Sequence, residues 1–408
     1  MHSYLWITLA ATSLAAADWP QWRGPNRDGK SGETGLLSAW PTGGPPRVWT
    51  ATGLGEGYSS VAIAGGRIYT QGQRGNSQYL LCYDAATGKK LWELSNGSSF
   101  HERRGPGPRG VPTVDGDRLY ALAADGTLSS VDVKSGQRVW SVSFTRDFGG
   151  EVPNWGYSES PLVDGNRVIV TPGGRQAGVV ALDKLNGKPI WKTQSDGAGY
   201  SSPVITQVGS GRVLLVLTDQ AALVLRADNG ELLSRHSNVS NRTANIATPI
   251  AHSGRAFFST DYGTGATLLK LAPNGAASEV YFSREMKNHY GSSVLVGEHL
   301  YGYNSQILTS MRFDTGEVAW RDRSVGKGSC IYAEKHLYCL GEDGVVGLVE
   351  ATPEAYREKS RFSFNKGSFP AWSPLAIANG HLYLRDQDFL YSFDIRAKPQ
   401  SPAVRVRE

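Results

Sequence analysis

Apolar and polar positions along this chain follow a unit that recurs from about residue 58 almost to the end of the sequence. Each unit has a short apolar stretch, a turn rich in Gly, Asp or Asn, and a second apolar stretch that ends near Leu-Tyr. A polar loop, a third stretch that ends in Asp, a tight turn and a fourth stretch complete it. Short alternating stretches between such turns predict β-strands, four in each unit.

The tight turn before the fourth stretch is the most regular part of the unit. The segment YDAATGKKLW at 83–92 returns as VDVKSGQRVW, LDKLNGKPIW and MRFDTGEVAW, with two weaker copies among them. The turn glycines are Gly88, Gly136, Gly187, Gly230, Gly275 and Gly316, at spacings of 48, 51, 43, 45 and 41 residues. Glycine suits this turn because a backbone with φ above zero carries no Cβ penalty there.

Four antiparallel strands at this period predict one blade of a β-propeller. No amphipathic helix alternates with the strands, so a parallel α/β fold is disfavoured. One stretch, 352–359, has a helix-like start with Thr352 as its cap and Pro353 in its first position, and we expect a short local helix there. The predicted fold class is all-β.

Counting the first strands gives eight blades, and the last blade is incomplete. It stops after its third strand, at 389–395, whereas 46–55 looks like a fourth strand that nothing precedes. We therefore predict an eight-bladed β-propeller of four-stranded antiparallel blades, whose ring is closed by the N-terminal strand completing the last blade. Closure of this kind removes the exposed edge of an open array.

Tryptophans recur at one position of the fourth strand. They are Trp49, Trp92, Trp140, Trp191 and Trp320. A stack of tryptophans suits a planar cofactor, but a column that repeats with the blade is what inter-blade packing needs, since one buried Trp removes about 150–250 Å² from water. We interpret this column as packing.

The two ends of the chain lie outside the repeat. Residues 1–17 form an apolar run that ends in three alanines, which is typical of a secretory signal peptide cleaved before Asp18; a buried N-terminal strand is the alternative. No cysteine follows the run, so we expect a periplasmic or secreted protein rather than a lipoprotein. The remaining divisions are an N-terminal arm at 18–45, the propeller at 46–397 and a C-terminal tail at 398–408.

Composition indicates a globular protein and excludes several classes of partner. The chain has 408 residues, 40% of them apolar and 19% charged, and 42 basic against 37 acidic side chains give a net charge of +5. This small imbalance makes no case for nucleic acid, and the densest basic stretch, 101–109, lacks the interleaved aromatics of a single-strand binder. No later segment is apolar enough to span a membrane. We expect a monomer.

Three cysteines are present, and two of them flank a hairpin. With Glu334 and Lys335 as its turn, Cys330 and Cys339 become a directly opposed pair without mutual hydrogen bonds, with Cα atoms roughly 4.5 Å apart. That distance lies within disulfide range. In an oxidising compartment we predict a disulfide between Cys330 and Cys339; two buried thiols are the alternative.

The segment DWPQWRGPNRDG at 18–29 combines residue types that suit either a ligand site or an attachment of the arm. Because it lies outside the repeat, we interpret it as an attachment. Trp19 and Trp22 are expected to pin the arm to the outside or floor of the ring, and Arg23 and Arg27 to pair with carboxylates.

The residues that enter the innermost strand of each blade should meet around one mouth of the central channel, which is the candidate ligand site. They are Tyr58, Arg109, Tyr157, Glu159, Tyr200, Asn245, His289, Tyr290, Lys327 and Trp372. Aromatic faces with a few charges suit a small-molecule or peptide site. We expect Arg109 and Lys327 to hold a carboxylate and Glu159 to accept from an amine. The alternative is that the aromatics plug the channel while the charges pair with one another.

Familiar catalytic and metal motifs are missing from the sequence. GPGPRG at 105–110 matches a phosphate-loop spacing but neither follows a strand nor opens a helix, and its prolines remove amides. Asp386 and Asp388 could share a calcium, although two carboxylates on one loop are more often a solvated turn. We therefore assign no catalytic residue and no metal site.

With its repeats of the form DAATGKKLW, the chain from about 48 to 397 resembles the pyrroloquinoline-quinone-like repeat family. This family includes eight-bladed quinoprotein dehydrogenases and the BamB-type outer-membrane assembly scaffold. The WPQWRGP segment and WGYSESPLV at 155–163 are also similar to an exported subgroup without an assigned activity. The resemblance implies pyrroloquinoline quinone (PQQ), a calcium ion, a catalytic Asp and two adjacent cysteines for the enzymes, and a lipid-bearing cysteine for the scaffold. No adjacent cysteine pair, matching calcium ligands or lipid-bearing cysteine can be identified here.

Fold and motifs together favour an exported, non-catalytic binding or scaffold protein that presents a loop-lined face to a protein partner or a small ligand. Two alternatives stay open: a PQQ-dependent dehydrogenase and a polysaccharide-binding module, the latter using the aromatic rim to hold a glycan.

Overall fold

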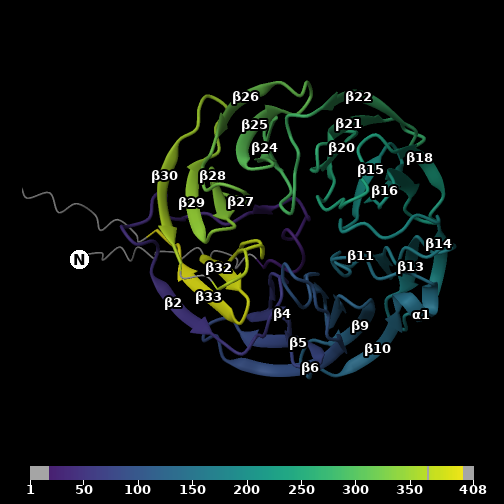
Figure 1. Ribbon diagram of the computed structural model, residues 1–408, viewed down its shortest axis with the longest axis horizontal. Coiled ribbons are helices and arrows are strands. Elements are labelled where there is room, and N and C mark those ends of the chain that lie inside the picture. The colour runs from purple at the N-terminus through teal and green to yellow at the C-terminus, as the bar shows by residue number, and fades with distance from the viewer. Residues whose placement is uncertain (1–17, 365–366, 398–408) are drawn as a thin grey trace, which may run out of the picture.

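The computed structural model describes residues 18–364 and 367–397. The predicted signal peptide, 1–17, and the predicted tail, 398–408, lie outside the described residues. In the described part, eight sheets are arranged around a central axis as a flat ring (Figure 1). The prediction of an all-β, eight-bladed propeller is confirmed.

The first four blades follow one another in the sequence. Blade 1 contains β3 (Ala62–Ala64), β4 (Arg67–Arg74), β5 (Ser77–Asp84) and β6 (Lys90–Ser98). Blade 2 contains β7 (Thr113–Asp115), β8 (Arg118–Leu122), β9 (Thr127–Asp132) and β10 (Arg138–Ser143). Blade 3 contains β11 (Leu162–Asp164), β12 (Arg167–Val170), β13 (Val179–Asp183) and β14 (Pro189–Thr193). Blade 4 contains β15 (Val204–Val208), β16 (Gly211–Leu217), β17 (Ala222–Arg226) and β18 (Leu232–His236).

The other four blades complete the ring. Blade 5 contains β19 (Ile250–His252), β20 (Arg255–Thr260), β21 (Gly265–Leu271) and β22 (Ala277–Ser283). Blade 6 contains β23 (Val294–Val296), β24 (His299–Asn304), β25 (Ile307–Arg312) and β26 (Val318–Asp322). Blade 7 contains β27 (Gly328–Ala333), β28 (His336–Gly341), β29 (Val345–Glu350) and β30 (Glu358–Ser363). Blade 8 contains β31 (Ala376–Ala378), β32 (His381–Asp386), β33 (Phe389–Asp394) and β2 (Arg47–Ala51).

The ring closes as predicted, by pairing the beginning of the chain with its end. Strand β2 runs antiparallel to β33, with Trp49 opposite Ser392 and Ala51 opposite Leu390. One arrangement was not predicted: β1 (Lys30–Ser31), in the N-terminal arm, pairs in parallel with β27 and makes blade 7 five-stranded.

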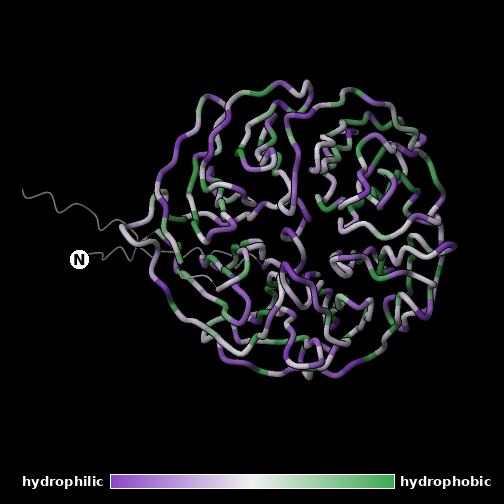
Figure 2. Tube along the Cα trace, viewed as in Figure 1, coloured by the Kyte–Doolittle hydropathy of each residue, from purple (hydrophilic) through white to green (hydrophobic). Residues whose placement is uncertain are grey.

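The tryptophan column packs between blades, as expected. The Trp92 indole lies on Gly136 of the next blade, where an added Cβ would meet its ring at 2.6 Å, and its Nε1 donates to the Val133 carbonyl at 3.2 Å. Trp140 covers Gly187 in the same way. Glycine is needed at these turns for its positive φ and also because the neighbouring indole occupies the space of a side chain. Apolar residues recur along the blades (Figure 2). Their buried side chains form clusters that join neighbouring blades, such as blades 4 and 5 and blades 5 and 6.

The described residues contain little helix, and it does not form where the sequence predicted it. The predicted helix at 352–359 is wrong: Glu358 and Lys359 begin β30, and the residues before them form bends and irregular backbone. Within the described residues the helix that does form is α1 (Phe144–Phe148), five residues long, whose N-cap Ser143 accepts from the Arg146 backbone amide. Its Phe144 and Phe148 side chains are buried, so tertiary packing determines its position. In the described part of the chain, no helix has the length and apolar character that crossing a membrane requires.

Candidate functional site

The N-terminal arm crosses the centre of the ring (Figure 1). Trp19 exchanges two backbone hydrogen bonds with Ile63 of blade 1, both of 2.8 Å, and Trp22 donates from its indole to Thr248, before blade 5, at 2.7 Å. The segment attaches the arm, as expected, but at the centre of the ring, where Trp22 also lines a cavity.

The arginines of the arm do not pair with carboxylates, contrary to prediction. Arg23 donates to the carbonyls of Ser292 and Ser293 at 3.2 and 2.6 Å. Arg27 donates to the carbonyls of Ser160 and Pro161 at 2.7 and 3.0 Å. Both guanidiniums are buried among the inner-strand entries, where main-chain carbonyls are the available acceptors. Each arginine thus ties the arm to a different blade.

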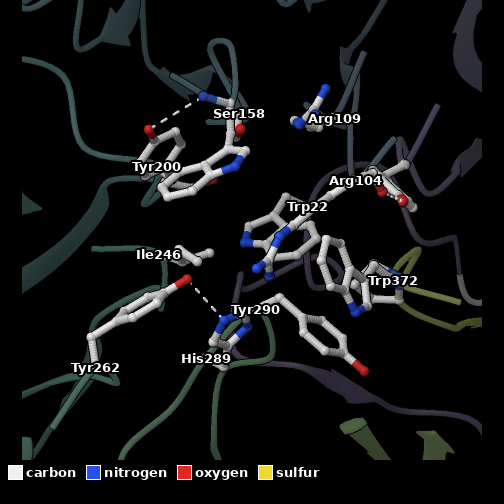
Figure 3. Close-up of a pocket in the computed structure, with 14 residues that line it drawn as sticks. Trp22, Arg104, Arg109, Ser158, Tyr200, Ile246, Tyr262, His289, Tyr290 and Trp372 are labelled. Atoms are coloured by element: carbon white, nitrogen blue, oxygen red, sulfur yellow. Dashed lines mark hydrogen bonds between the residues drawn. The ribbon is translucent and has the colours of Figure 1, made fainter. Parts of the chain in front are cut away.

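A cavity of about 130 Å³ lies above the arm on the axis of the ring. We call it the central cavity (Figure 3). Its walls are mainly aromatic, and the rings that line it are Trp22, Tyr58, Trp155, Tyr200, Tyr262, His289, Tyr290 and Trp372. Arg104, Arg109, Ser158, Ser202, Ile246 and Pro374 complete the lining.

Most of these residues come from loops that lead into an innermost strand, as the sequence predicts. Tyr58, Arg109, Tyr200, His289, Tyr290 and Trp372 line the central cavity, as expected for the mouth of the channel. The rings support one another: the centroid of Trp372 lies 5.3 Å from that of Tyr58 and 5.5 Å from that of Tyr290. Such contacts hold the aromatic walls in place.

Four predicted residues do not line the cavity, and two of them belong to blade 3. Tyr157 packs edge-on against Phe144, 5.1 Å between centroids, and donates to the Pro172 carbonyl at 2.8 Å. Glu159 is buried and accepts from the backbone amide and hydroxyl of Thr171 at 2.7 and 2.5 Å. The predicted role of Glu159 as an amine acceptor is wrong, because its oxygens bind the inside of blade 3.

Asn245 and Lys327 are the other two corrections. Asn245 is buried and donates to the carbonyls of Thr218 and Asp219 at 2.9 and 3.1 Å. The Lys327 ammonium lies 3.6 Å from a Glu342 oxygen and 5.6 Å from the centroid of the Trp372 ring. Lys327 therefore has a carboxylate partner of its own and is absent from the cavity lining.

Several residues of the cavity were not predicted from the sequence. Trp22 was interpreted only as an attachment, and Arg104 was set aside in the basic stretch 101–109. Tyr262 lies in the loop between β20 and β21, which is at the same end of an antiparallel blade as the entry to β19. The position of this loop at the cavity end of the blade is therefore the signal from which Tyr262 could have been predicted.

The positive charge of the cavity comes from Arg104 and Arg109. Arg109 donates to the carbonyls of Gly107 and Gly105 at 2.5 and 2.8 Å, with its guanidinium carbon 5.1 Å from the Phe100 ring centroid. Burial lowers the pKa of Arg109 to about 10, so it remains a cation at neutral pH. Within the described residues, neither arginine forms an ion pair and no Asp or Glu side chain lines the cavity.

The other titratable groups of the cavity are neutral near pH 7. Burial, reinforced by the Lys327 charge, lowers the pKa of His289 to about 4. Its Nε2 lies 2.9 Å from the Tyr262 hydroxyl, and burial raises the pKa of Tyr262 above its usual value. The lining therefore combines neutral rings with two guanidiniums.

A second cavity, of about 260 Å³, shares Tyr200 with the central one. Its lining is more polar and includes Glu151, Asp219 and Arg242. It lies between the loops that lead into blades 4 and 5 and the loop that leads into blade 3. The two cavities are therefore neighbours, with the Tyr200 side chain in the lining of both.

The cysteine register is as predicted, with Cys330 opposite Cys339 in the β27–β28 hairpin. The structure differs in their oxidation state, since Cys82, Cys330 and Cys339 are all buried free thiols. Asp388, one of the two aspartates that could share a calcium, accepts from the amides of Gly53 and Gly55 at 3.1 and 2.7 Å. It thereby fastens the segment after β2. The described residues contain no cluster of three or more side chains that could hold a metal.

The cofactor set implied by the family resemblance does not fit the central cavity. Calcium needs several oxygen ligands, but no carboxylate of the described residues lines the cavity and two guanidiniums do. The cysteines are not adjacent in the sequence either. No reaction step through calcium-bound quinone follows from these residues.

Comparison with known proteins identifies relatives of two kinds. A family model described as "Outer membrane protein assembly factor BamB" matches residues 36–147 and 147–322. The chain is 31% identical over 120 residues to outer membrane protein assembly factor BamB of Burkholderia pseudomallei (strain K96243), covering 29% of this chain and 28% of that protein. It is 30% identical over 139 residues to quinohemoprotein alcohol dehydrogenase ADH-IIG of Pseudomonas putida, covering 32% of this chain and 18% of that protein. The matches thus span less than a third of these relatives' own lengths.

Solved structures with the same fold include the crystal structure of BamB from Moraxella catarrhalis. Its TM-score is 0.63 at 13% sequence identity, and the match covers 86% of this chain and 99% of that one. The structure of ADHIIG from Pseudomonas putida HK5 gives the same score and identity, over 96% of this chain and 82% of that one. At this identity the likeness establishes the fold alone.

Proposed function

Because the chain belongs to the family of the outer membrane protein assembly factor BamB, we propose that it is an exported binding protein without catalytic activity of its own. It takes a small ligand, or a side chain of a protein partner, into the central cavity. The N-terminal arm supplies the floor of this site, and the loops between blades supply its walls.

The observation that carries the proposal is the set of residues around the cavity. Eight rings converge there with two guanidiniums, and the His289 imidazole is neutral and hydrogen-bonded. A concave, mostly aromatic site with few charged groups suits binding. Acid–base catalysis would need a group that titrates near neutral pH and reaches the ligand. Glu159, the carboxyl whose pKa is raised to about 7, is instead hydrogen-bonded inside blade 3.

Intrinsic fluorescence provides the test, because Trp22, Trp155 and Trp372 line the cavity. Titration with panels of small organic acids, oligosaccharides and peptides should give saturable quenching with some members. The Arg104→Ala variant should weaken that quenching, while the melting temperature stays constant, since the Arg104 side chain donates no hydrogen bond within the described residues. Arg103→Ala, in the same loop and outside the cavity lining, is the matched control.

The dehydrogenase alternative is tested in parallel. Adding quinone and calcium should produce neither a long-wavelength absorbance band nor reduction of an electron-accepting dye. Alcohol-dependent dye reduction would overturn the non-catalytic proposal. Retardation on a glycan affinity gel would favour the polysaccharide alternative.

Export is proposed from the composition of residues 1–17. N-terminal sequencing of the protein from the periplasmic or secreted fraction of its host should begin at Asp18. Recovery of the chain with residues 1–17 attached, in the cytoplasmic fraction only, would contradict export.

A further inference from the structure

We propose that the ligand of the central cavity is a single planar ring bearing a carboxylate. The inference rests on the proposed binding function and specifies its chemistry. Three features of the cavity lead to it: the balance of charge, the donors that remain available and the size of the space between the rings.

The charge of the lining selects an anion. Arg104 and Arg109 both line the cavity, and no Asp or Glu of the described residues does so. Arg109 is partly buried among aromatic rings, and a guanidinium in such a place is costly unless a counter-ion accompanies it, whereas Arg104 is exposed and reaches the cavity from its open side. Lys327, which is outside the lining, is different because a Glu342 oxygen lies 3.6 Å from its ammonium. The Glu102 charge acts on Arg109 from outside the lining, but neither arginine of the cavity forms an ion pair within the described residues, so the lining itself carries a net positive charge.

The donors that remain suit a carboxylate. A guanidinium has five N–H donors in a planar fork. Arg109 uses donors on its two terminal nitrogens for Gly107 and Gly105, so other N–H groups stay available. Arg104 donates no side-chain hydrogen bond in the part of the chain that is described, and Figure 3 shows it extending toward the middle of the cavity. Two guanidinium groups at one cavity can bind both oxygens of a carboxylate.

The walls and the volume select one ring. Trp22, Tyr58, Trp155 and Trp372 present flat faces or edges to the space, which favours stacking over hydrogen bonding. The cavity of about 130 Å³ is close to the roughly 150 Å³ that holds a benzene molecule in a protein core. The site differs from a quinone site in its missing calcium ligands, since no carboxylate of the described residues lines it.

Two sources could supply this chemistry: a free aromatic acid, or the C-terminal aromatic residue of a polypeptide. The second cavity shares Tyr200 with the first and is polar, with Asp219 and Arg242 in its lining. It could accept the preceding residues of a peptide. The shared element is the ring with its carboxylate, and the experiment separates the sources.

The test uses the full chain and three probes with the same ring: phenylacetate, phenylacetamide and phenethylamine. Fluorescence titration should give binding of phenylacetate about tenfold or more tighter than of the neutral amide, and weaker still for the amine. Arg104→Gln should reduce the preference for the acid, and Arg103→Gln should leave it unchanged. Equal or tighter binding of the amide or amine, or no binding of any probe, would overturn the inference.

The outcomes separate this inference from the proposed function. If the amide, the amine or a sugar binds and the acid does not, the ligand class is wrong and the cavity is still a binding site. If no member of the wider panels quenches the cavity tryptophans, the proposed function fails as well.

A last comparison of ligands identifies the source of the aromatic acid. A short peptide ending in phenylalanine with a free carboxylate is compared with its C-terminal amide and with phenylacetate. If the peptide with the free carboxylate binds more tightly than phenylacetate, and Arg242→Gln weakens the binding of that peptide, the ligand is a polypeptide C-terminus. Equal affinity of peptide and phenylacetate indicates a free aromatic acid. Binding of the amidated peptide as tight as that of the acid would contradict the role of the carboxylate.

Discussion

The indole of Trp22 donates a hydrogen bond of 2.7 Å to the hydroxyl of Thr248, a residue 226 positions away in the sequence. This contact joins the N-terminal arm to the opposite side of the ring and holds the Trp22 ring in the lining of the central cavity. One segment therefore both fastens the ring and forms part of its candidate site.

Removing the Arg27 guanidinium should destabilise the ring. Arg27→Met keeps the stem but leaves the carbonyls of Ser160 and Pro161 without this donor. A buried acceptor that loses its partner costs about 1–3 kcal/mol, so urea denaturation should show a clear drop in the free energy of unfolding. Arg146→Met, at an exposed position of α1, is the control and should leave the midpoint unchanged. Equal free energies of unfolding for the two variants would show that the hydrogen bonds of Arg27 do not stabilise the ring.

The buried Glu159 should make stability depend on pH. Burial raises its pKa from 4.5 to about 7, against the opposing Thr171 hydrogen bonds and the Arg27 charge. Since the folded-state pKa lies above the unfolded one, this contribution to stability is complete below about pH 4.5 and is lost as the pH rises through 7. The full span is on the order of 3 kcal/mol.

Glu159→Gln tests this dependence because the amide can still bond with Thr171 and does not titrate. Relative to the wild type, the variant should gain stability as the pH rises from about 4.5 to about 7, the range that the two pKa values define. Melting curves across this range provide the measurement. Parallel curves for the two proteins would contradict a raised pKa at Glu159.

The contact between Trp92 and Gly136 should not tolerate a methyl group. In Gly136→Ala the new Cβ would meet the indole at 2.6 Å, at a φ of +73°. Gly116→Ala, in the same blade with a φ of +58°, adds its Cβ to open space. The control isolates backbone strain, about 1–2 kcal/mol, and Gly136→Ala should lose more than this in chemical denaturation. Equal losses would show that inter-blade packing adds nothing there.

The paired cysteines give a prediction about the exported protein. Cys330 and Cys339 are directly opposed in the hairpin, so oxidation after export should join them and leave Cys82 as the free thiol. Intact-mass analysis after alkylation without reduction should show one modified thiol. Three modified thiols would show that the free state seen in the structure persists outside the cell.

The fold could be predicted in unusual detail because a propeller is built from local patterns. The turn glycines and strand alternation repeat in each blade, and the pairing of β2 with β33 follows from a missing strand at one end and a spare one at the other. The wrong prediction also came from a local pattern. Pro353 after Thr352 is typical of a helix start, but in blade 7 the segment leads into strand β30 instead.

The site was predicted only in part, because strand periodicity indicates which loop a residue occupies and not where its side chain points. Tyr58 and Tyr157 occupy corresponding positions in blades 1 and 3, yet Tyr58 lines the central cavity and Tyr157 packs on Phe144 of α1. The difference depends on a helix that the sequence pattern did not reveal.

By itself, therefore, the sequence determined the all-β class, the number of blades, the closure of the ring and the cysteine register, since each depends on residues a few positions apart or on a repeat. Only the tertiary structure decided the path of the arm, the carbonyl partners of Arg23 and Arg27, and which rings and charges meet on the axis. These depend on contacts between distant segments, where the nearest acceptor and the remaining space are set by the packed ring.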